Sequence, residues 1–248
     1  MASQGCTAVP LAIQPKAYLA TAENHLIEAL PRKDRVNLLA ISESVQLVLG
    51  DVLCERGGAM RHVYFPVDGF ISLLTAVDTH PSLEVGMVGR EGMLGASLTL
   101  GVPTTPLRAI VQGQGAAWRI GSAVFRRELA RSPSLQRSLA RYLYVMMAQL
   151  ASSAACLRFH LIGPRLARWL LMSQDRAHAE RFHVTHEFLA YMLGVRRVGI
   201  TAAAGTLQRA GLIEYHRGEL TVLDRSGLEA AACTCYAGDR QAYDALMR

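Results

Sequence analysis

The chain has 248 residues, of which 51% are hydrophobic and 19% are charged. This balance is typical of a folded globular protein and excludes disorder as the state of the whole chain. The length exceeds the usual size of one domain, so we expect two domains. The formal net charge of +6 suits a polyanionic partner but does not by itself require one.

The cysteines and the apolar runs predict where the protein resides. The five cysteines, at positions 6, 54, 156, 233 and 235, are odd in number and too scattered for a disulfide scaffold. We read no signal peptide in residues 1–19, and the longest uncharged run, 142–157, is too short for a membrane span. We therefore expect a cytoplasmic protein without a membrane partner.

The N-terminal part is predicted to hold an arm and two short helices. Residues 1–22 are expected to form a loose arm. A helical pattern covers 23–30, and Pro31 stands where a second helix over 32–41 can begin. In that second helix we expect Val36, Leu39 and Ala40 to face inward.

Between Val45 and Ile120, short β-prone runs alternate with turn residues. This alternation predicts many short antiparallel strands that close into a β-roll without helices. We assign residues 23–133 to this domain. The clearest predicted strands are 45–49, 63–65, 70–77 and 83–88.

A long helix is predicted over 134–158, and we treat 134–160 as a dimerisation helix. Its heptad-like seam indicates a face that meets a partner helix, whereas a second apolar stripe can cover the β-roll. The alternative is a buried helix in a monomer. The seam consists of Leu139, Leu143, Met146, Leu150, Ser153 and Leu157, and the second stripe of Tyr142, Val145, Met147 and Ala154.

The remaining residues, 161–248, follow the order of a winged helix-turn-helix domain. A supporting helix over 164–172 precedes a helix that begins at Thr185, and Gly194 supplies a sharp turn. A second helix is predicted over 196–210, then a hairpin whose tip is 216–219, and a last helix over 225–233. The overall prediction is an α+β protein, although a merely structural helical hairpin is the alternative for this part.

Two groups of motifs resemble the Crp/Fnr family of bacterial transcriptional regulators. One group is the stretch 185–197 with 205–213 and 223–225. The other matches the family's cyclic-nucleotide-type β-roll and consists of 50–53, 63–65, 68–69, 89–92 and Gly95. The resemblance implies a homodimer, not an enzyme, that binds a near-palindromic operator in double-stranded DNA. RNA polymerase would be a partner if the protein activates transcription.

The resemblance also implies the DNA-contacting residues. The family's guanine-reading arginine falls on Arg197, whereas its acidic and second basic readers fall on Val198 and Ala202. Thr201 lies on the same predicted outward face. Phosphate contacts are implied for Thr185, His186 and Arg217. Arg196 could contact either a base or a phosphate.

The effector differs from that of the nucleotide-binding members. The family's glutamate and its Arg-Ser or Arg-Thr pair, which hold the ribose and the cyclic phosphate, correspond to Ala96 and Thr105-Pro106. Loss of the phosphate-binding arginine predicts no tight binding of cyclic AMP, and Arg108 is out of register. An iron–sulfur cluster cannot be assembled from Cys6 and Cys54. We identify no cofactor or metal ligand set, because Cys233-Thr234-Cys235 lacks an evident third ligand. The alternatives are a regulator without a ligand, and a β-roll binding protein or enzyme with a C-terminal interaction module.

Overall fold

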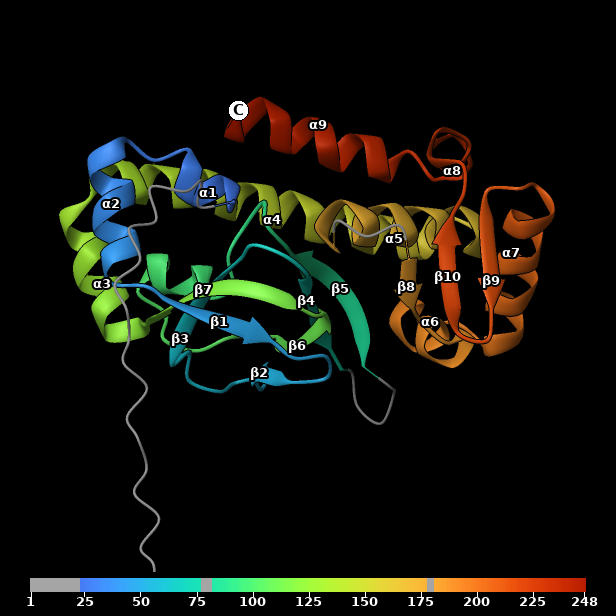
Figure 1. The fold of residues 1–248 in the computed structure, drawn as a ribbon, viewed down its shortest axis with the longest axis horizontal. Helices are drawn as coiled ribbons and strands as arrows, with labels where there is room; N and C mark the ends of the chain where they lie inside the picture. Colours follow the sequence, from blue (N-terminus) through green and yellow to red (C-terminus); the bar gives the residue numbers. More distant parts are fainter. Residues whose placement is uncertain (1–22, 77–81, 178–180) are drawn as a thin grey trace, which may run out of the picture.

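A computed structural model of the chain describes residues 23–76, 82–177 and 181–248. The arm predicted for 1–22 and the end of the strand predicted over 70–77 lie outside the described residues. Figure 1 shows a β-rich N-terminal half, a long helix beside it, and a mainly helical C-terminal half with its own small sheet. The predicted α+β class is confirmed.

Two short helices open the described chain, α1 (His25–Glu28) and α2 (Arg32–Ala40). The buried Asn24 caps α1 and also donates from Nδ2 to the carbonyls of Pro66 and Gly92, both at 2.9 Å. The prediction that Val36 and Ala40 face inward is wrong. Leu38 is buried instead, and Val36, two residues and about 200° away around the helix, is 52% exposed.

The β-roll consists of two antiparallel sheets with strand orders β1-β7-β3 and β2-β6-β4-β5. The 3₁₀ helix η1 (Ala96–Leu100) interrupts it, so the prediction of a roll without helices is wrong in this detail. The strands are β1 (Glu43–Leu47), β2 (Val52–Cys54), β3 (His62–Pro66), β4 (Phe70–Thr75), β5 (Leu83–Val88), β6 (Arg108–Gly113) and β7 (Gly115–Gly121).

A glycine is required where the β3–β4 turn presses against the β6–β7 turn. Gly69 has φ +73°, and a Cβ at this position would overlap the carbonyl oxygens of Gly113 and Gln114. Because neither backbone segment can give way cheaply, only glycine fits at this position.

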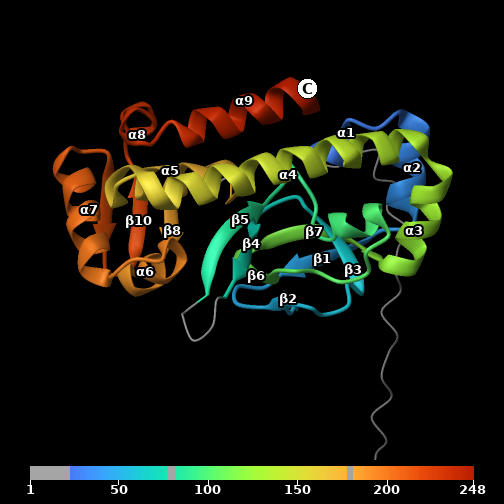
Figure 2. The same cartoon turned by 180° about the vertical axis from the view of Figure 1, so that it is seen from behind.

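Helix α3 (Ser122–Arg131) leads into α4 (Pro133–Phe159), which runs along the β-roll toward the C-terminal half (Figure 2). The exposed stripe of α4 lies one residue C-terminal to the seam that we predicted. Leu139 and Ser153 are buried within the chain, whereas Met147, which we expected to cover the roll, is 61% exposed. Ala154 is exposed as well. Apolar residues lie all round α4, so spacing alone did not identify which side packs on the roll.

The exposed side of α4 has a heptad spacing of its own, which we call the α4 seam. Its members recur at alternate steps of four and three residues, and two of them, Tyr144 and Met147, are large. The α4 seam consists of Ala140, Tyr144, Met147, Ala151, Ala154 and Arg158.

The C-terminal half has the predicted order of elements, with a three-stranded sheet of order β8-β10-β9. No helix among the described residues has the length and hydropathy needed to span a membrane. The elements are α5 (Ile162–Ala177), β8 (Arg181–His183), α6 (His186–Leu193), α7 (Arg197–Arg209), β9 (Ile213–His216), β10 (Glu219–Val222), α8 (Arg225–Ala231) and α9 (Cys235–Met247).

The final helix α9, which we did not predict, leaves the C-terminal half and lies along α4 (Figures 1 and 2). Its Asp239 forms an ion pair of 2.7 Å with Arg168 of α5. Its Tyr243 donates a hydrogen bond of 3.1 Å to the carbonyl of Glu91 in the β-roll. Helix α9 therefore connects the two halves of the molecule.

Candidate functional site

The turn between α6 and α7 depends on the residues at the ends of the two helices. Thr185 caps α6, and its hydroxyl accepts a hydrogen bond of 3.1 Å from the Phe188 amide. Gly194 ends α6 with φ +62°, a left-handed conformation that favours glycine, and Arg196 then caps α7. The two helices are thus joined by three residues, as the sequence predicted.

Helix α7 has one buried and one exposed face. Its inner face packs on the C-terminal core through Ile200, Ala204 and Leu207, as predicted. On the outer face, Val198 is 79% exposed, and Arg197, Thr201 and Ala202 are exposed as well. Because the side chains beyond Arg197 are small, this face is narrow enough to enter a groove about 12 Å wide.

Arg197 is the prominent cation of this face. Its side chain is 70% exposed, and its nearest acidic partner, Glu187 of α6, lies 4.0 Å away and is itself exposed. Such a solvated pair is weak. The guanidinium is therefore available to an incoming ligand.

His186 has a different environment from the one expected of a phosphate contact. Its ring stacks on Tyr215 of β9 at a centroid distance of 4.4 Å, and Nδ1 lies 3.0 Å from the Thr201 hydroxyl. Since that hydroxyl donates to the Arg197 carbonyl, it accepts from His186. Burial, followed by the charge of Arg197, lowers the pKa of His186. The neutral ring thus positions α6, α7 and the wing relative to one another.

The hairpin between β9 and β10 is the predicted wing. Arg217 and Gly218 form its two-residue tip with φ +49° and +88°, the left-handed pair that a tight hairpin needs. The Gly218 carbonyl accepts a bond of 2.8 Å from the Val184 amide, and His183 lies 2.7 Å from Glu219. Arg217 is exposed at the tip.

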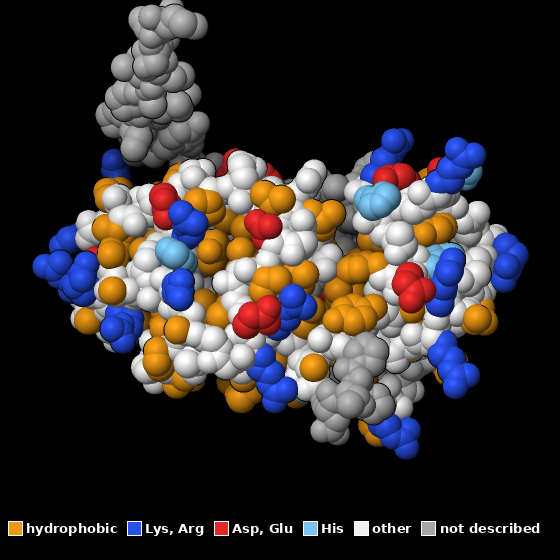
Figure 3. Space-filling model, turned by 90° about the horizontal axis from the view of Figure 1, so that it is seen from below, with side chains coloured by type: hydrophobic (Ala, Val, Ile, Leu, Met, Phe, Trp, Pro, Cys, Tyr) orange, Lys and Arg blue, Asp and Glu red, His pale blue; other side chains and the backbone are white. Residues whose placement is uncertain are grey.

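Basic side chains surround this end of the molecule. Figure 3 shows basic side chains (blue) at the end that carries α6, α7 and the wing, and these are arginines, because the chain's two lysines are Lys16 and Lys33. Arg196, Arg197 and Arg217 are all exposed there. A positive, protruding surface of this kind can bind a polyanion by neutralising its phosphates.

The β-roll and α4 enclose a second candidate site, a cavity of about 990 Å³. Ala96 and Thr105 both line it and are buried. Arg126 is the one charged residue among the described residues of its wall. Arg108 is absent from that wall and pairs with Glu55 at 3.2 Å. The cavity is therefore mainly apolar, and it reaches Tyr144 and Met147 of the α4 seam.

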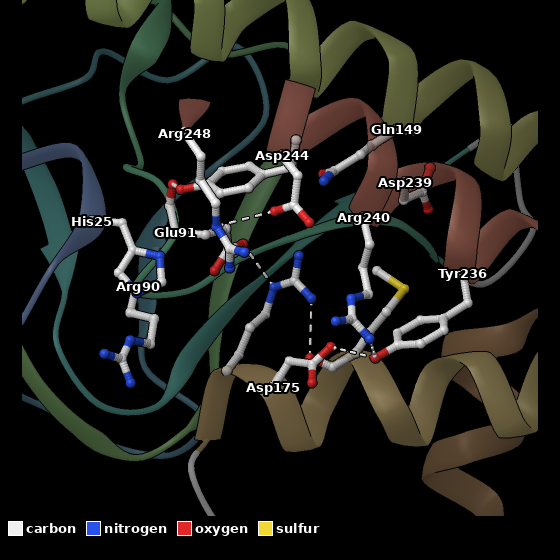
Figure 4. Close-up of a pocket in the computed structure, with 13 residues that line it drawn as sticks. His25, Arg90, Glu91, Gln149, Asp175, Tyr236, Asp239, Arg240, Asp244 and Arg248 are labelled. Atoms are coloured by element: carbon white, nitrogen blue, oxygen red, sulfur yellow. Dashed lines mark hydrogen bonds and ion pairs between the residues drawn. The ribbon is translucent and has the colours of Figure 1, made fainter. Parts of the chain in front are cut away.

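A smaller polar pocket of about 330 Å³ lies between α9, α5 and the β-roll (Figure 4). Arg176 of α5 holds Glu91 of the roll at 2.8 Å with little exposure of either side chain. Asp175 accepts a hydrogen bond of 2.9 Å from Tyr236. These two contacts join α5 to the β-roll and to α9 at the wall of the pocket.

The cysteines near the C-terminus have partners that the sequence analysis missed. We concluded that Cys233 and Cys235 lack a third ligand. The structure corrects this, because Cys156 and His160, at the C-terminal end of α4, lie close to them. A search for a cysteine and a histidine four residues apart on one helix would have found both. We call the four residues the Cys3His cluster: Cys156, His160, Cys233 and Cys235.

Comparison with known proteins identifies the C-terminal half and the fold. The family model of the Crp-like helix-turn-helix domain matches residues 164–231. No curated protein matches the chain by sequence.

Solved structures resemble the whole arrangement. The CRP-family transcriptional regulator TTHB099 from Thermus thermophilus has a TM-score of 0.63 at 20% identity, over 76% of this chain and 96% of that one. The c-di-GMP responsive global regulator CLP from Xanthomonas campestris has a TM-score of 0.62 at 17% identity, over 77% and 99%. FixK2 from Bradyrhizobium japonicum has a TM-score of 0.59 at 14% identity, over 78% and 98%. These similarities establish the fold.

Proposed function

We propose that this chain is a regulator of the Crp/Fnr type, which binds a near-palindromic operator as a homodimer and regulates transcription. The observation that carries the proposal is the outer face of α7, where Arg197 projects beside small exposed residues. The similar solved proteins are regulators, so we propose a regulatory rather than an enzymatic role in the cytoplasm.

In this proposal α7 enters the major groove, and Arg197 donates two hydrogen bonds to a guanine. Val198 and Thr201 contact neighbouring base pairs, while Thr185, Arg196 and Arg217 contact phosphates. His186 contributes by holding Thr201 in place. Two subunits would place their α7 helices about 34 to 36 Å apart, one turn of DNA.

The dimer would form through the α4 seam. Tyr144 and Met147 are more than half exposed in the single chain, and a heptad-spaced apolar stripe of this length is usually covered. The β-roll cavity borders the same residues, so an effector in the cavity would contact the dimer interface. We propose that this effector is not cyclic AMP, because Ala96 replaces the family's glutamate and Thr105-Pro106 replaces the pair whose arginine holds the cyclic phosphate.

Selection from a pool of random duplexes would identify the operator and test the DNA contacts. Arg197→Ala is expected to weaken cognate binding by about 1 to 3 kcal/mol and to relax discrimination at one base pair per half-site. Arg217→Ala is expected to weaken all sequences alike and to lower the salt slope by about one per subunit. Arg127→Ala, an exposed arginine on α3, is the control. If Arg197→Ala leaves base discrimination unchanged, α7 is not the helix that enters the major groove.

Sedimentation velocity tests the dimer. The double variant Tyr144→Glu, Met147→Glu introduces four like charges into the proposed interface and should give monomers. Val36→Glu, at an apolar α2 position of similar exposure, is the matched control and should remain dimeric. A dimer that survives the double variant would contradict the role of the α4 seam.

A further inference from the structure

The Cys3His cluster is assembled at the junction between the two halves. Cys156 lies in the last turn of α4, and His160, four residues later, is the C-cap of that helix. Cys233 lies in the link between α8 and α9, and Cys235 is the first residue of α9. The Cys233 amide also donates to the Pro164 carbonyl in α5 at 3.3 Å. Residues from three elements thus converge on one point.

The distances in the cluster match those of a tetrahedral site. The Cys156 and Cys233 sulfurs are 3.5 Å apart, the Cys235 sulfur lies 3.6 Å from His160 Nδ1, and all four ligand atoms lie within 4.8 Å of one another. Bond lengths of about 2.3 Å to sulfur and 2.0 Å to nitrogen in a tetrahedron place sulfurs about 3.8 Å apart, and sulfur and nitrogen about 3.6 Å apart. Small movements of side chains would therefore suffice to bind an ion.

The surroundings suit the charge of such a site. Three thiolates, a neutral imidazole and a divalent ion sum to one negative charge, and Arg168 lies beside the cluster with its side chain 10% exposed. Its Nε is buried and has no hydrogen-bond partner among the described residues.

We propose that the Cys3His cluster binds a borderline-soft divalent ion of the zinc class, and that this ion fixes the α4–α5 junction. Three sulfurs and one imidazole in a tetrahedron are the donor set of zinc rather than of magnesium or calcium. A disulfide between Cys156 and Cys233 would use only two of the four residues and leave the placement of Cys235 and His160 without a reason.

The ion would act at the α4–α5 junction itself, in addition to the contacts by which α5 and α9 already hold the β-roll. Only His160 and Leu161 separate α4 from α5, and the neighbouring apolar side chains Phe159 and Leu161 are 74% and 80% exposed. Binding ties α4 directly to the segment that follows α8 and so sets the orientation of the helix-turn-helix domain. The effect of the ion on the orientation of the helix-turn-helix domain rests on the proposed function, since it predicts that DNA affinity depends on the ion.

The metal site is tested on the full chain, purified under reducing conditions and stripped by a chelator. One equivalent of Zn²⁺ should bind per chain and raise Tm by about 5 °C or more. Co²⁺ should give the intense visible bands of a tetrahedral thiolate complex, which Zn²⁺ then abolishes. No saturable binding, or the weak spectrum of octahedral Co²⁺, would overturn the proposal. So would a Cys156–Cys233 disulfide forming in air while the reduced protein takes up no ion.

Variants locate the site. Cys233→Ser with Cys235→Ser should lose at least nine-tenths of the bound zinc, and His160→Asn should alter the Co²⁺ spectrum while leaving the three thiolates. Cys54→Ser, a buried cysteine of the β-roll, is the matched control and should bind like the unaltered protein. Wild-type stoichiometry in the double variant would place the ion elsewhere. If the double variant does not fold, the Co²⁺ spectra of the unaltered chain and of His160→Asn still decide.

The DNA step has a separate readout. On a duplex selected from the random pool, removal of zinc should weaken binding at least tenfold, and Cys54→Ser should respond in the same way. Equal affinity with and without zinc would overturn the regulatory step. Failure to select any duplex in either state would refute the proposed function, whereas the stoichiometry and the Co²⁺ spectrum would still report on the metal site.

Discussion

Glu84 provides a test of how the β-roll meets the C-terminal half. The carboxylate lies on β5, accepts a hydrogen bond of 2.9 Å from Trp169 Nε1 in α5, and contacts the Ser72 hydroxyl at 2.5 Å. Burial raises the pKa of Glu84 from its ordinary 4.5 to about 7, although both hydrogen bonds act in the opposite direction. Glu84→Gln retains both bonds, because the amide oxygen can accept from Trp169 and the amide nitrogen can donate to Ser72.

The raised pKa determines the sign of the effect. A folded-state pKa above the unfolded value means that the contribution of Glu84 to stability is fully present below about pH 4.5 and is lost as the pH rises through about 7. A difference of one in pKa corresponds to about 1.4 kcal/mol, so the whole change amounts to about 3 kcal/mol. Stability in the Gln variant does not depend on pH through this residue.

Urea unfolding followed by tryptophan fluorescence measures the effect. The unfolding free energy of Glu84→Gln minus that of the unaltered protein should rise by about 3 kcal/mol between about pH 4.5 and pH 8. Other titrating groups are common to both proteins and cancel in this difference. A difference that is the same at both pH values would show that Glu84 ionises as it does in the unfolded chain, and the reasoning from burial would be refuted.

Three further predictions concern the turns, the junction and the cavity. Gly69→Ala should lower the unfolding free energy by at least about 2 kcal/mol more than Gly57→Ala in urea titrations, because both have positive φ but only Gly69 faces backbone oxygens. Arg176→Ala should cost about 3 to 5 kcal/mol by leaving Glu91 without its partner, and the double variant Arg176→Met, Glu91→Leu should cost less; the opposite order would contradict the buried pair. Millimolar cyclic AMP should not change Tm, and a saturable shift would show that Ala96 and Thr105 do not mark the family's nucleotide-binding positions.

The elements that the sequence predicted well are those defined by local chemistry. Gly194 and Thr185 fix the turn and the cap whatever surrounds them, and the alternation of small residues with Ile200 and Leu207 identifies the inner face of α7. The wing follows from a two-residue turn that needs left-handed conformations, which Gly218 supplies. In these cases a few neighbouring residues determine the outcome.

The misses depended on contacts between distant segments. The side of α4 that packs on the β-roll could not be read from spacing, since Leu143 and Tyr144 are both apolar and one residue apart. Helix α9 gave no sign of where it docks, because Asp239 and Tyr243 find their partners in α5 and in the roll. The Cys3His cluster was missed for the same reason, as 77 residues separate Cys156 from Cys233.

The course of α9 has a consequence for how this protein can be divided or recombined. A DNA-binding module that ends at α8 could be exchanged between regulators as a unit, but here the chain returns to α4 and reaches Glu91 of the β-roll. In a chimera joined at Leu161, α9 would face an α4 helix from another protein, and the hydrogen bond from Tyr243 to Glu91 would be lost. The two halves are therefore coupled through α9, and replacing the β-roll requires a matching change in the last helix.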